Sequence, residues 1–215
     1  MTRTPRATTA SPRAKPLKRP QQARARFTVQ AIYDAFVRIW RRDGWARLTT
    51  RAVALETGIS VGTLYDYFPS KEALLSGYVR HAMEALLARL VEPSGGSTWQ
   101  AQLSRLVRLT AGADNEGLPL VDRDMLLLEA QIAEPKHHRR FYEELVAAWR
   151  TSLAQCDDLP RMPPDEALRA LAVAAWGGRR YLLLVQPGDL TTAQWAAQME
   201  ALCLAALSGQ RRAGS

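Results

Sequence analysis

Side chains suited to contacting a polyanion are concentrated between Thr49 and Lys71, where the sequence reads TTRAVALETGISVGTLYDYFPSK. Hydroxyl groups of serine, threonine and tyrosine donate to phosphate oxygens, and lysine and arginine add positive charge. An arginine such as Arg51 can also pair with guanine through two hydrogen bonds. These residue types predict non-covalent recognition of nucleic acid.

The chain offers little from which a catalytic centre could be built. It contains three histidines (His81, His137 and His138), no His-Glu-x-x-His sequence and no glycine-rich phosphate loop. Cys156 and Cys203 match no metal-binding or redox spacing, which favours a reducing, intracellular compartment. We therefore expect no enzyme activity, no cofactor and no metal site.

The Thr49–Lys71 segment carries the signals of two short helices joined by a tight turn. Thr49 and Ser60 are good N-caps, Gly58 can adopt the left-handed conformation of a sharp turn, and Pro69 stops the second helix. Such a pair predicts a helix-turn-helix, whose second helix can enter a DNA major groove. The alternative is an ordinary helical hairpin within a core.

The second of these helices separates into an anchoring side and a small, polar side. Leu64 and Phe68 fall on one side of a helical wheel, and Gly62, Thr63 and Asp66 fall roughly opposite. The small residues would let the backbone approach DNA closely. Asp66 is interpreted either as an acceptor for a cytosine amine or as a solvated or arginine-paired acid.

Helical periodicity dominates the rest of the chain, and no stretch alternates as a strand would. We predict an all-α fold of about nine helices, with a first helix from near Gln22 to Gly44 and a fourth from Ser70 to about Val91. The predicted domains are residues 21–70 and 71–210. The later helices are expected at about 98–112, 119–134, 137–156, 165–185 and 191–208.

The excess of positive over negative charge lies at the N-terminus. The formal net charge is +8, and residues 1–27 hold eight lysines and arginines and no acid, whereas residues 28–215 hold 21 of each sign. We expect residues 1–20 to form a disordered basic arm that attracts DNA phosphates, the alternative being a solubilising tail. The sequence predicts neither a secretory signal nor a membrane span.

The helix-turn-helix segment closely resembles the TetR family of bacterial transcription regulators over roughly residues 20–80. The matching residues are Thr49, Val53-Ala54, Gly58-Ile59-Ser60, Gly62-Thr63-Leu64-Tyr65, Tyr67-Phe68, and Ser70-Lys71-Glu72 with Leu74. The resemblance implies an N-terminal three-helix DNA-binding domain joined to a C-terminal helical domain that binds a ligand and dimerises.

The resemblance also implies roles for individual residues. Thr49, Thr50 and Arg51, at the beginning of the first motif helix, would contact phosphates, and Arg51 would also reach a base. Tyr65 and Tyr67 would donate to phosphate, and Lys71 would clamp one. The leading end of the recognition helix would be formed by Ser60, Val61, Gly62 and Thr63.

In the C-terminal part, the resemblance implies a homodimer through the helices at about 165–185 and 191–208, and a pocket for an unidentified small molecule. Gly177-Gly178 in mid-helix is tolerable if another helix packs there. Ordinary core packing is the alternative for every candidate pocket residue. These candidates are Trp99, Leu103, Met125, Leu128, Phe141, Tyr142, Trp149 and Trp176.

The sequence thus predicts a ligand-responsive transcriptional regulator, most simply a repressor that binds double-stranded DNA at a palindromic operator and is released by its effector. The alternative is a DNA-binding regulator with no small-molecule effector. The expected location is the bacterial cytoplasm, in association with the nucleoid.

Overall fold

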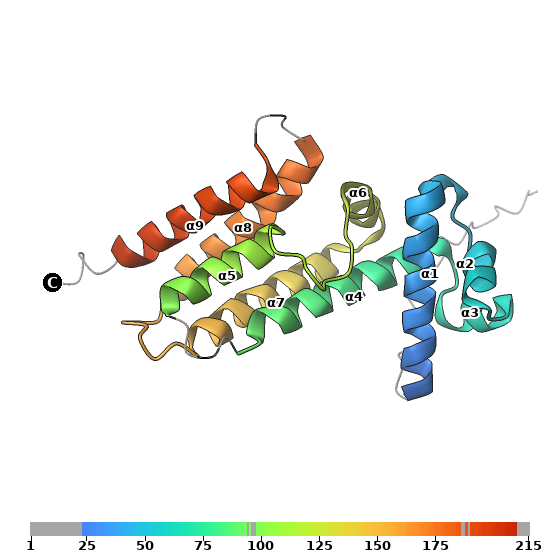
Figure 1. Ribbon diagram of the computed structural model, residues 1–215, viewed down its shortest axis with the longest axis horizontal. Coiled ribbons are helices and arrows are strands. Elements are labelled where there is room, and N and C mark those ends of the chain that lie inside the picture. Colours follow the sequence, from blue (N-terminus) through green and yellow to red (C-terminus); the bar gives the residue numbers. More distant parts are fainter. Residues whose placement is uncertain (1–22, 94, 96–97, 186–187, 189, 210–215) are drawn as a thin grey trace, which may run out of the picture. The chain divides into compact units, whose positions relative to one another are not determined.

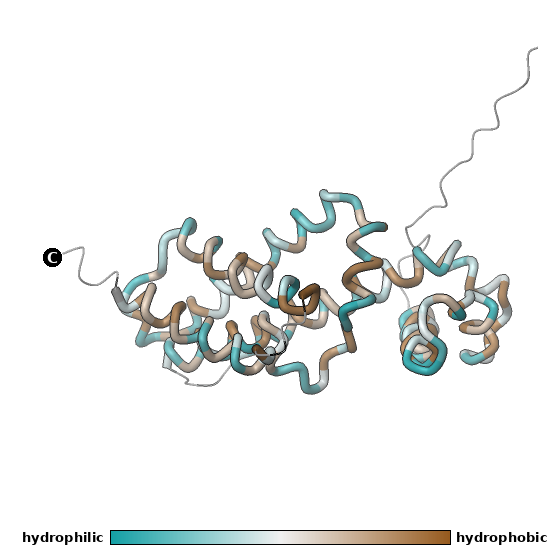
Figure 2. Tube along the Cα trace, turned by 90° about the horizontal axis from the view of Figure 1, so that it is seen from above, coloured by the Kyte–Doolittle hydropathy of each residue, from teal (hydrophilic) through white to brown (hydrophobic). Residues whose placement is uncertain are grey.

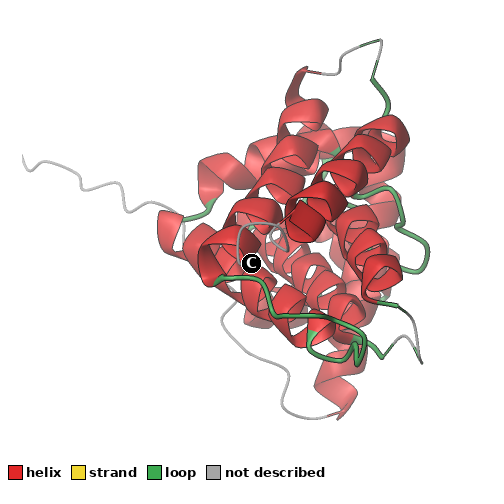
Figure 3. Ribbon diagram, turned by 90° about the vertical axis from the view of Figure 1, so that its left-hand side faces the viewer, coloured by secondary structure: helices red, strands yellow, loops and turns green. Residues whose placement is uncertain are grey.

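The computed structural model describes residues 23–93, 95, 98–185, 188 and 190–209, and every regular element within these residues is an α-helix (Figure 3). The predicted all-α fold is confirmed. The expected basic arm, residues 1–20, lies outside the described residues. The helices are α1 (Ala23–Arg47), α2 (Thr50–Thr57), α3 (Val61–Tyr67), α4 (Lys71–Val91), α5 (Trp99–Ala111), α6 (Arg123–Ile132), α7 (Pro135–Leu153), α8 (Asp165–Val185) and α9 (Thr192–Gly209).

The chain forms two compact units that divide within α4. The first unit extends to Tyr78 and the second begins at Val79. The sequence predicts this division between residues 70 and 71, at the start of the same helix. No helix in the described part of the chain combines the length and apolar character needed to cross a bilayer.

The first unit contains α1, α2, α3 and the beginning of α4 (Figure 1). Aromatic side chains form much of its core. Ile32, Phe36 and Ile39 are fully buried and form one face of α1. The centroid of the Tyr33 ring lies 5.6 Å from the ring centroids of both Phe68 and Tyr78. This core fixes the end of α3 against α1.

The helices α5, α7, α8 and α9 lie in the second unit (Figure 1). Together with the second half of α4, they form the unit's own core. Hydrophobic and hydrophilic residues alternate along these helices, as amphipathic packing requires (Figure 2). Trp149 is completely buried, and its indole N–H donates to Thr110 Oγ1 at 3.0 Å. Gln102 is also buried and donates to Ser152.

Two helix ends differ from the sequence prediction. The helix expected at 119–134 begins only at Arg123, because Asp122 is its N-cap and accepts from the Met125 N–H at 2.9 Å. The helix expected to begin at about residue 137 begins at Pro135. Proline suits this position, because the first turn of a helix needs no N–H from it.

The first helix also differs at its end. The sequence predicts an end at Gly44, but α1 continues through Arg47 with Gly44 as a break in non-helical geometry (φ 71°, ψ 174°). The N–H of Leu48 donates to the Gly44 carbonyl at 3.2 Å, which adds a short turn after the break. That turn places Trp45 beside the start of α4, as described below.

The adjacent glycines of α8 have different surroundings. A Cβ on Gly178 would lie 2.1 Å from a ring carbon of Trp195 in α9, whereas a Cβ on Gly177 would meet nothing within 4 Å. The sequence predicts that another helix packs against these mid-helix glycines. Helix α9 does so at Gly178 but not at Gly177. The Trp195 ring occupies the place of the missing side chain.

We predict opposite effects of the same substitution at these two glycines. Gly178→Ala should lower the free energy of unfolding by about 1–3 kcal/mol, because the rigid Trp195 ring must move. Gly177→Ala should raise it by up to about 1 kcal/mol through helix propensity. Urea unfolding measures both, and equal effects would contradict this packing.

Candidate nucleic-acid interface

The turn between α2 and α3 is made by Gly58. Its φ of 77° and ψ of 18° are left-handed, and its N–H donates to the Leu55 carbonyl at 3.1 Å. The next N–H, that of Ile59, reaches back to the Ala54 carbonyl at 3.1 Å. These bonds satisfy two of the carbonyls at the end of α2, those of Ala54 and Leu55. The chain then enters α3 at Val61.

Side-chain caps fix the beginning of each helix around this turn. Thr49 Oγ1 accepts from the Ala52 N–H at 3.1 Å, and Ser60 Oγ accepts from the Thr63 N–H at 3.0 Å. Ser70 caps α4 in the same way through the Ala73 N–H. Thr49 and Ser60 are the N-caps that the sequence predicts, and Ser70 is the residue at which the sequence predicts the fourth helix to begin.

Helix α3 is anchored on one side and open on the other. Leu64 and Phe68 are 0% and 1% exposed, which confirms them as the residues that hold the helix. Gly62, on the opposite side, is exposed. Val61 (38%) and Tyr65 (45%) are exposed as well. The first turn of α3 therefore offers backbone and small side chains to an external partner.

A hydrogen bond joins the two motif helices beside this open face. Thr50 Oγ1 in α2 donates to the hydroxyl oxygen of Tyr65 in α3 at 3.2 Å. Because the Tyr65 oxygen accepts here, its own proton can donate to a further acceptor. The hydrogen bond therefore holds the hydroxyl of an exposed tyrosine in place and leaves its proton available to a phosphate oxygen.

Lys71, expected to clamp a phosphate, has partners within its own unit. Its Nζ lies 4.3 Å from the ring centroid of Trp45 and donates to the Trp45 carbonyl at 3.2 Å. The ammonium is therefore held in one place, and an ammonium has three N–H donors. Sequence reasoning missed Trp45, because this contact joins residues that are 26 positions apart in the chain.

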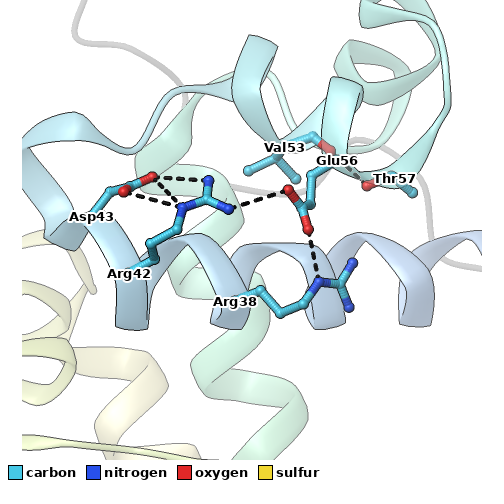
Figure 4. Close-up of polar contacts among 6 residues, drawn as sticks. All are labelled: Arg38, Arg42, Asp43, Val53, Glu56 and Thr57. Atoms are coloured by element: carbon cyan, nitrogen blue, oxygen red, sulfur yellow. Dashed lines mark hydrogen bonds and ion pairs between the residues drawn. The ribbon is translucent and has the colours of Figure 1, made fainter.

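A second set of polar contacts fixes α2 on α1 (Figure 4). Arg38 Nε donates to Glu56 at 2.9 Å, and Arg42 forms an ion pair with the same carboxylate at 3.6 Å. Arg42 also donates to Asp43 at 3.0–3.2 Å. The hydrogen bond from Arg38 is the main cause that holds the pKa of Glu56 below its ordinary value.

The lowered pKa of Glu56 predicts a pH dependence of stability. Its contribution is present above the ordinary pKa of a glutamate and is lost as pH falls through the lower, folded-state value. Between about pH 5 and about pH 3, the urea midpoint of wild type should therefore fall more than that of Glu56→Gln.

Arg38→Gln should behave like Glu56→Gln, because it removes the donor of the hydrogen bond. Arg41→Gln is the control, since Arg41 is an exposed arginine on the same helix. An identical acid response of wild type and Glu56→Gln would show that Glu56 does not fix α2 on α1.

The structure places all ten predicted contact residues in α2, α3 or the residues that begin α2, α3 and α4, and leaves each at least partly exposed. Arg51 is exposed on α2. Sequence reasoning missed the supporting residues Arg38, Arg42 and Glu56, because their contacts join helices that are separate in sequence.

The predicted effector residues fall into two groups in the second unit. Fully or almost fully buried are Trp99, Leu103, Met125 and Trp149, whereas Leu128, Phe141, Tyr142 and Trp176 are half-buried. Phe141 and Trp176 lie side by side, with ring centroids 4.8 Å apart. Among the described residues, no three His, Cys, Asp or Glu side chains gather as metal ligands would.

Comparison with known proteins agrees with this geometry. Residues 32–77 match the family model described as bacterial regulatory proteins, tetR family. The nucleoid occlusion factor SlmA of Marinobacter nauticus is 30% identical over 130 residues, which cover 59% of this chain and 66% of that protein. The transcriptional repressor KstR of Rhodococcus jostii is 32% identical over 99 residues, 46% of this chain and 43% of the repressor.

These alignments span at most about two thirds of the curated relatives. Among solved structures, a TetR transcription regulator from Haloarcula marismortui has a TM-score of 0.60 at 18% identity, over 86% of this chain and 98% of its own. FadR of Thermus thermophilus has a TM-score of 0.53 at 22% identity, over 82% of this chain and 93% of the FadR chain. The fold is thus shared along most of the chain.

The helix-turn-helix geometry and these matches lead to one conclusion about the family. The chain belongs to the TetR family of bacterial regulators.

Proposed function

We propose that this protein is a DNA-binding transcriptional regulator, acting as a repressor on a palindromic operator and released by a small-molecule effector. The observation that carries the proposal is the open first turn of α3, where Val61 and Gly62 are exposed while Leu64 anchors the helix. A recognition helix needs this combination, because one side must hold it and the other must reach bases.

The proposed DNA contacts are the ten residues predicted from the sequence. Arg51 reads a base, because it is exposed on the helix that precedes the turn. Thr49, Thr50, Tyr65 and Tyr67 contact phosphates, and Lys71 does so with its ammonium held by Trp45. The first turn of α3 lies against the base edges through Ser60, Val61, Gly62 and Thr63.

A homodimer through α8 and α9 is supported by apolar side chains that the described chain leaves uncovered. Val173 and Leu184 are each 49% exposed and Tyr181 is 65% exposed, and together with Gly177 they follow one side of α8. Leu202 on α9 is also exposed. Contiguous exposed apolar surface marks an interaction site, and two recognition helices about one DNA turn apart read a palindrome.

We propose that an effector binds in the second unit, beside the half-buried residues of the predicted set. Phe141 and Trp176 provide an aromatic pair that is only partly covered. The proposed location is the bacterial cytoplasm, in association with the nucleoid.

The second candidate is a DNA-binding regulator with no small-molecule effector. It is favoured by the similarity to a protein named as a nucleoid occlusion factor, because that similarity extends over 130 residues and so beyond the first compact unit, which ends at Tyr78. An operator affinity that no cell metabolite changes would favour this candidate.

We propose that the operator lies beside the protein's own gene, and a footprint on the DNA flanking that gene tests the proposal. We expect protection of two inverted half-sites, and a dimer in analytical ultracentrifugation. Repetition of the footprint with cell metabolites tests release. A folded protein that protects no specific sequence there would contradict the regulation of its own locus.

A further inference from the structure

One arginine is buried in the second unit on the inward side of α8. The buried residues of this helix are Leu168, Ala172, Ala175 and Arg179, which recur at helical spacing and form its core-facing stripe. Arg179 is only 9% exposed. A guanidinium therefore stands where the stripe otherwise carries alanine and leucine.

Arg179 has no counter-charge within the described chain. Among the described residues, it has neither a hydrogen-bond partner nor an ion-pair partner. Burial lowers the pKa of Arg179 to about 10, which still leaves it positively charged at neutral pH. A buried charge is unfavourable unless an opposite charge or hydrogen-bond acceptors meet it.

The immediate neighbours of Arg179 shape a place for a flat cation. The Trp176 ring centroid lies 5.3 Å from the guanidinium carbon. A Cβ on Gly112, which caps the end of α5, would lie 2.7 Å from Arg179 Nε. Trp176 in turn contacts Phe141, and both rings are half-buried.

A dimer partner is poorly placed to supply the missing charge. The exposed stripe of α8 that we assign to the dimer includes Gly177, two positions from Arg179 and therefore nearly opposite it on the helix. The end of α5 offers partial negative charge from its last carbonyls. Arg179 could therefore serve only to cap the end of α5, and the experiment must distinguish this role from effector binding.

We propose that Arg179 binds the anionic group of the effector, and that the effector is an organic anion whose aromatic or apolar body lies against Trp176 and Phe141. This inference rests on the proposed effector response of the regulator. A guanidinium matches a carboxylate or phosphate through parallel hydrogen bonds, and the rings beside it favour an apolar body.

Thermal unfolding of the full chain with simple anions tests the inference. The probes are benzoate, octanoate and inorganic phosphate, with benzamide as the neutral match for benzoate and sodium chloride to equalise ionic strength. We expect benzoate or octanoate at saturation to raise the melting temperature by about 2 °C or more, and benzamide to leave it unchanged.

Arg179→Met should abolish the shift with the carboxylates, and Arg179→Gln is the second variant should the first fail to fold. The matched control is Arg139→Met, at an exposed arginine on α7, which should retain the shift. Without ligand, Arg179→Met should melt higher than wild type, because an uncompensated buried charge is removed.

Two results would overturn the inference. One is the absence of a shift with all three anions, and the other is the same shift in wild type and Arg179→Met. A lower melting temperature of Arg179→Met with an unchanged anion response would identify a capping role at α5 instead. Operator binding is measured on the same samples without anion. Wild-type protein that does not bind the operator would contradict the proposed function itself, whereas a failed anion response with intact operator binding would contradict only this inference.

Discussion

Gly62→Leu is expected to abolish specific DNA binding while the protein remains fully folded. Gly62 is exposed in the first turn of α3, and a Cβ there would approach only Ser60 Oγ, at 3.7 Å. A larger side chain therefore fits the free protein but would hold the helix away from the base edges. We expect operator affinity to fall at least about 100-fold, or roughly 2.7 kcal/mol.

Gly62→Ala should lie between glycine and leucine in affinity, and both variants should melt at or slightly above the wild-type temperature because glycine is a poor helix former. Gln30→Leu, which places a leucine at an exposed site on α1, is the control. Fluorescence anisotropy with the footprinted operator measures the series. Wild-type affinity of Gly62→Leu would mean that α3 does not approach DNA at this turn.

Trp149→Ala is expected to have the largest effect on stability. The side chain is completely buried, and its N–H donates to Thr110. Loss of the ring leaves a cavity and an unpaired hydroxyl, so the free energy of unfolding should fall by about 3–5 kcal/mol. Urea denaturation monitored by circular dichroism measures the change.

Trp176→Ala is the matched comparison, because Trp176 is half-buried and its ring contacts Phe141 and Arg179. We expect it to destabilise the protein less than Trp149→Ala does. Equal losses at the two tryptophans would contradict the division of the predicted effector residues into core and half-buried groups.

The DNA-binding unit could be predicted in detail because its signals are local. Thr49, Ser60 and Ser70 cap helices through N–H groups only three residues away, and Gly58 makes its turn through the residues just before it. Sequence spacing alone therefore identifies each bond. The buried face of α3, with Leu64, follows from helical periodicity in the same way.

Contacts between residues distant in sequence could not be predicted. Lys71 meets Trp45 because the chain turns after Gly44, and Glu56 meets Arg38 because α2 packs on α1. The positions of Pro135 and Asp122 show a further limit. Each residue type suits both a helix start and a loop, so the sequence alone did not place the ends of α6 and α7.

The second unit illustrates the same limit for a candidate binding site. Helical periodicity identified Trp149 and Trp176 equally as inward-facing residues, but only packing separates a completely buried ring from a half-buried one. Arg179 and Arg180 are adjacent in the sequence of α8. Their different surroundings depend on α5 and α6, which no local pattern reveals.

The open face of α3 is expected to read a specific DNA sequence, and this is the claim on which the proposed function depends. Selection of binding sites from a pool of random duplexes with the purified full chain tests it directly, because no operator has to be chosen beforehand. We predict enrichment of one palindrome with half-site centres about one helical turn apart, and no enrichment with Gly62→Leu. A folded wild-type protein that enriches no sequence, or enriches the same one as Gly62→Leu, would contradict the claim.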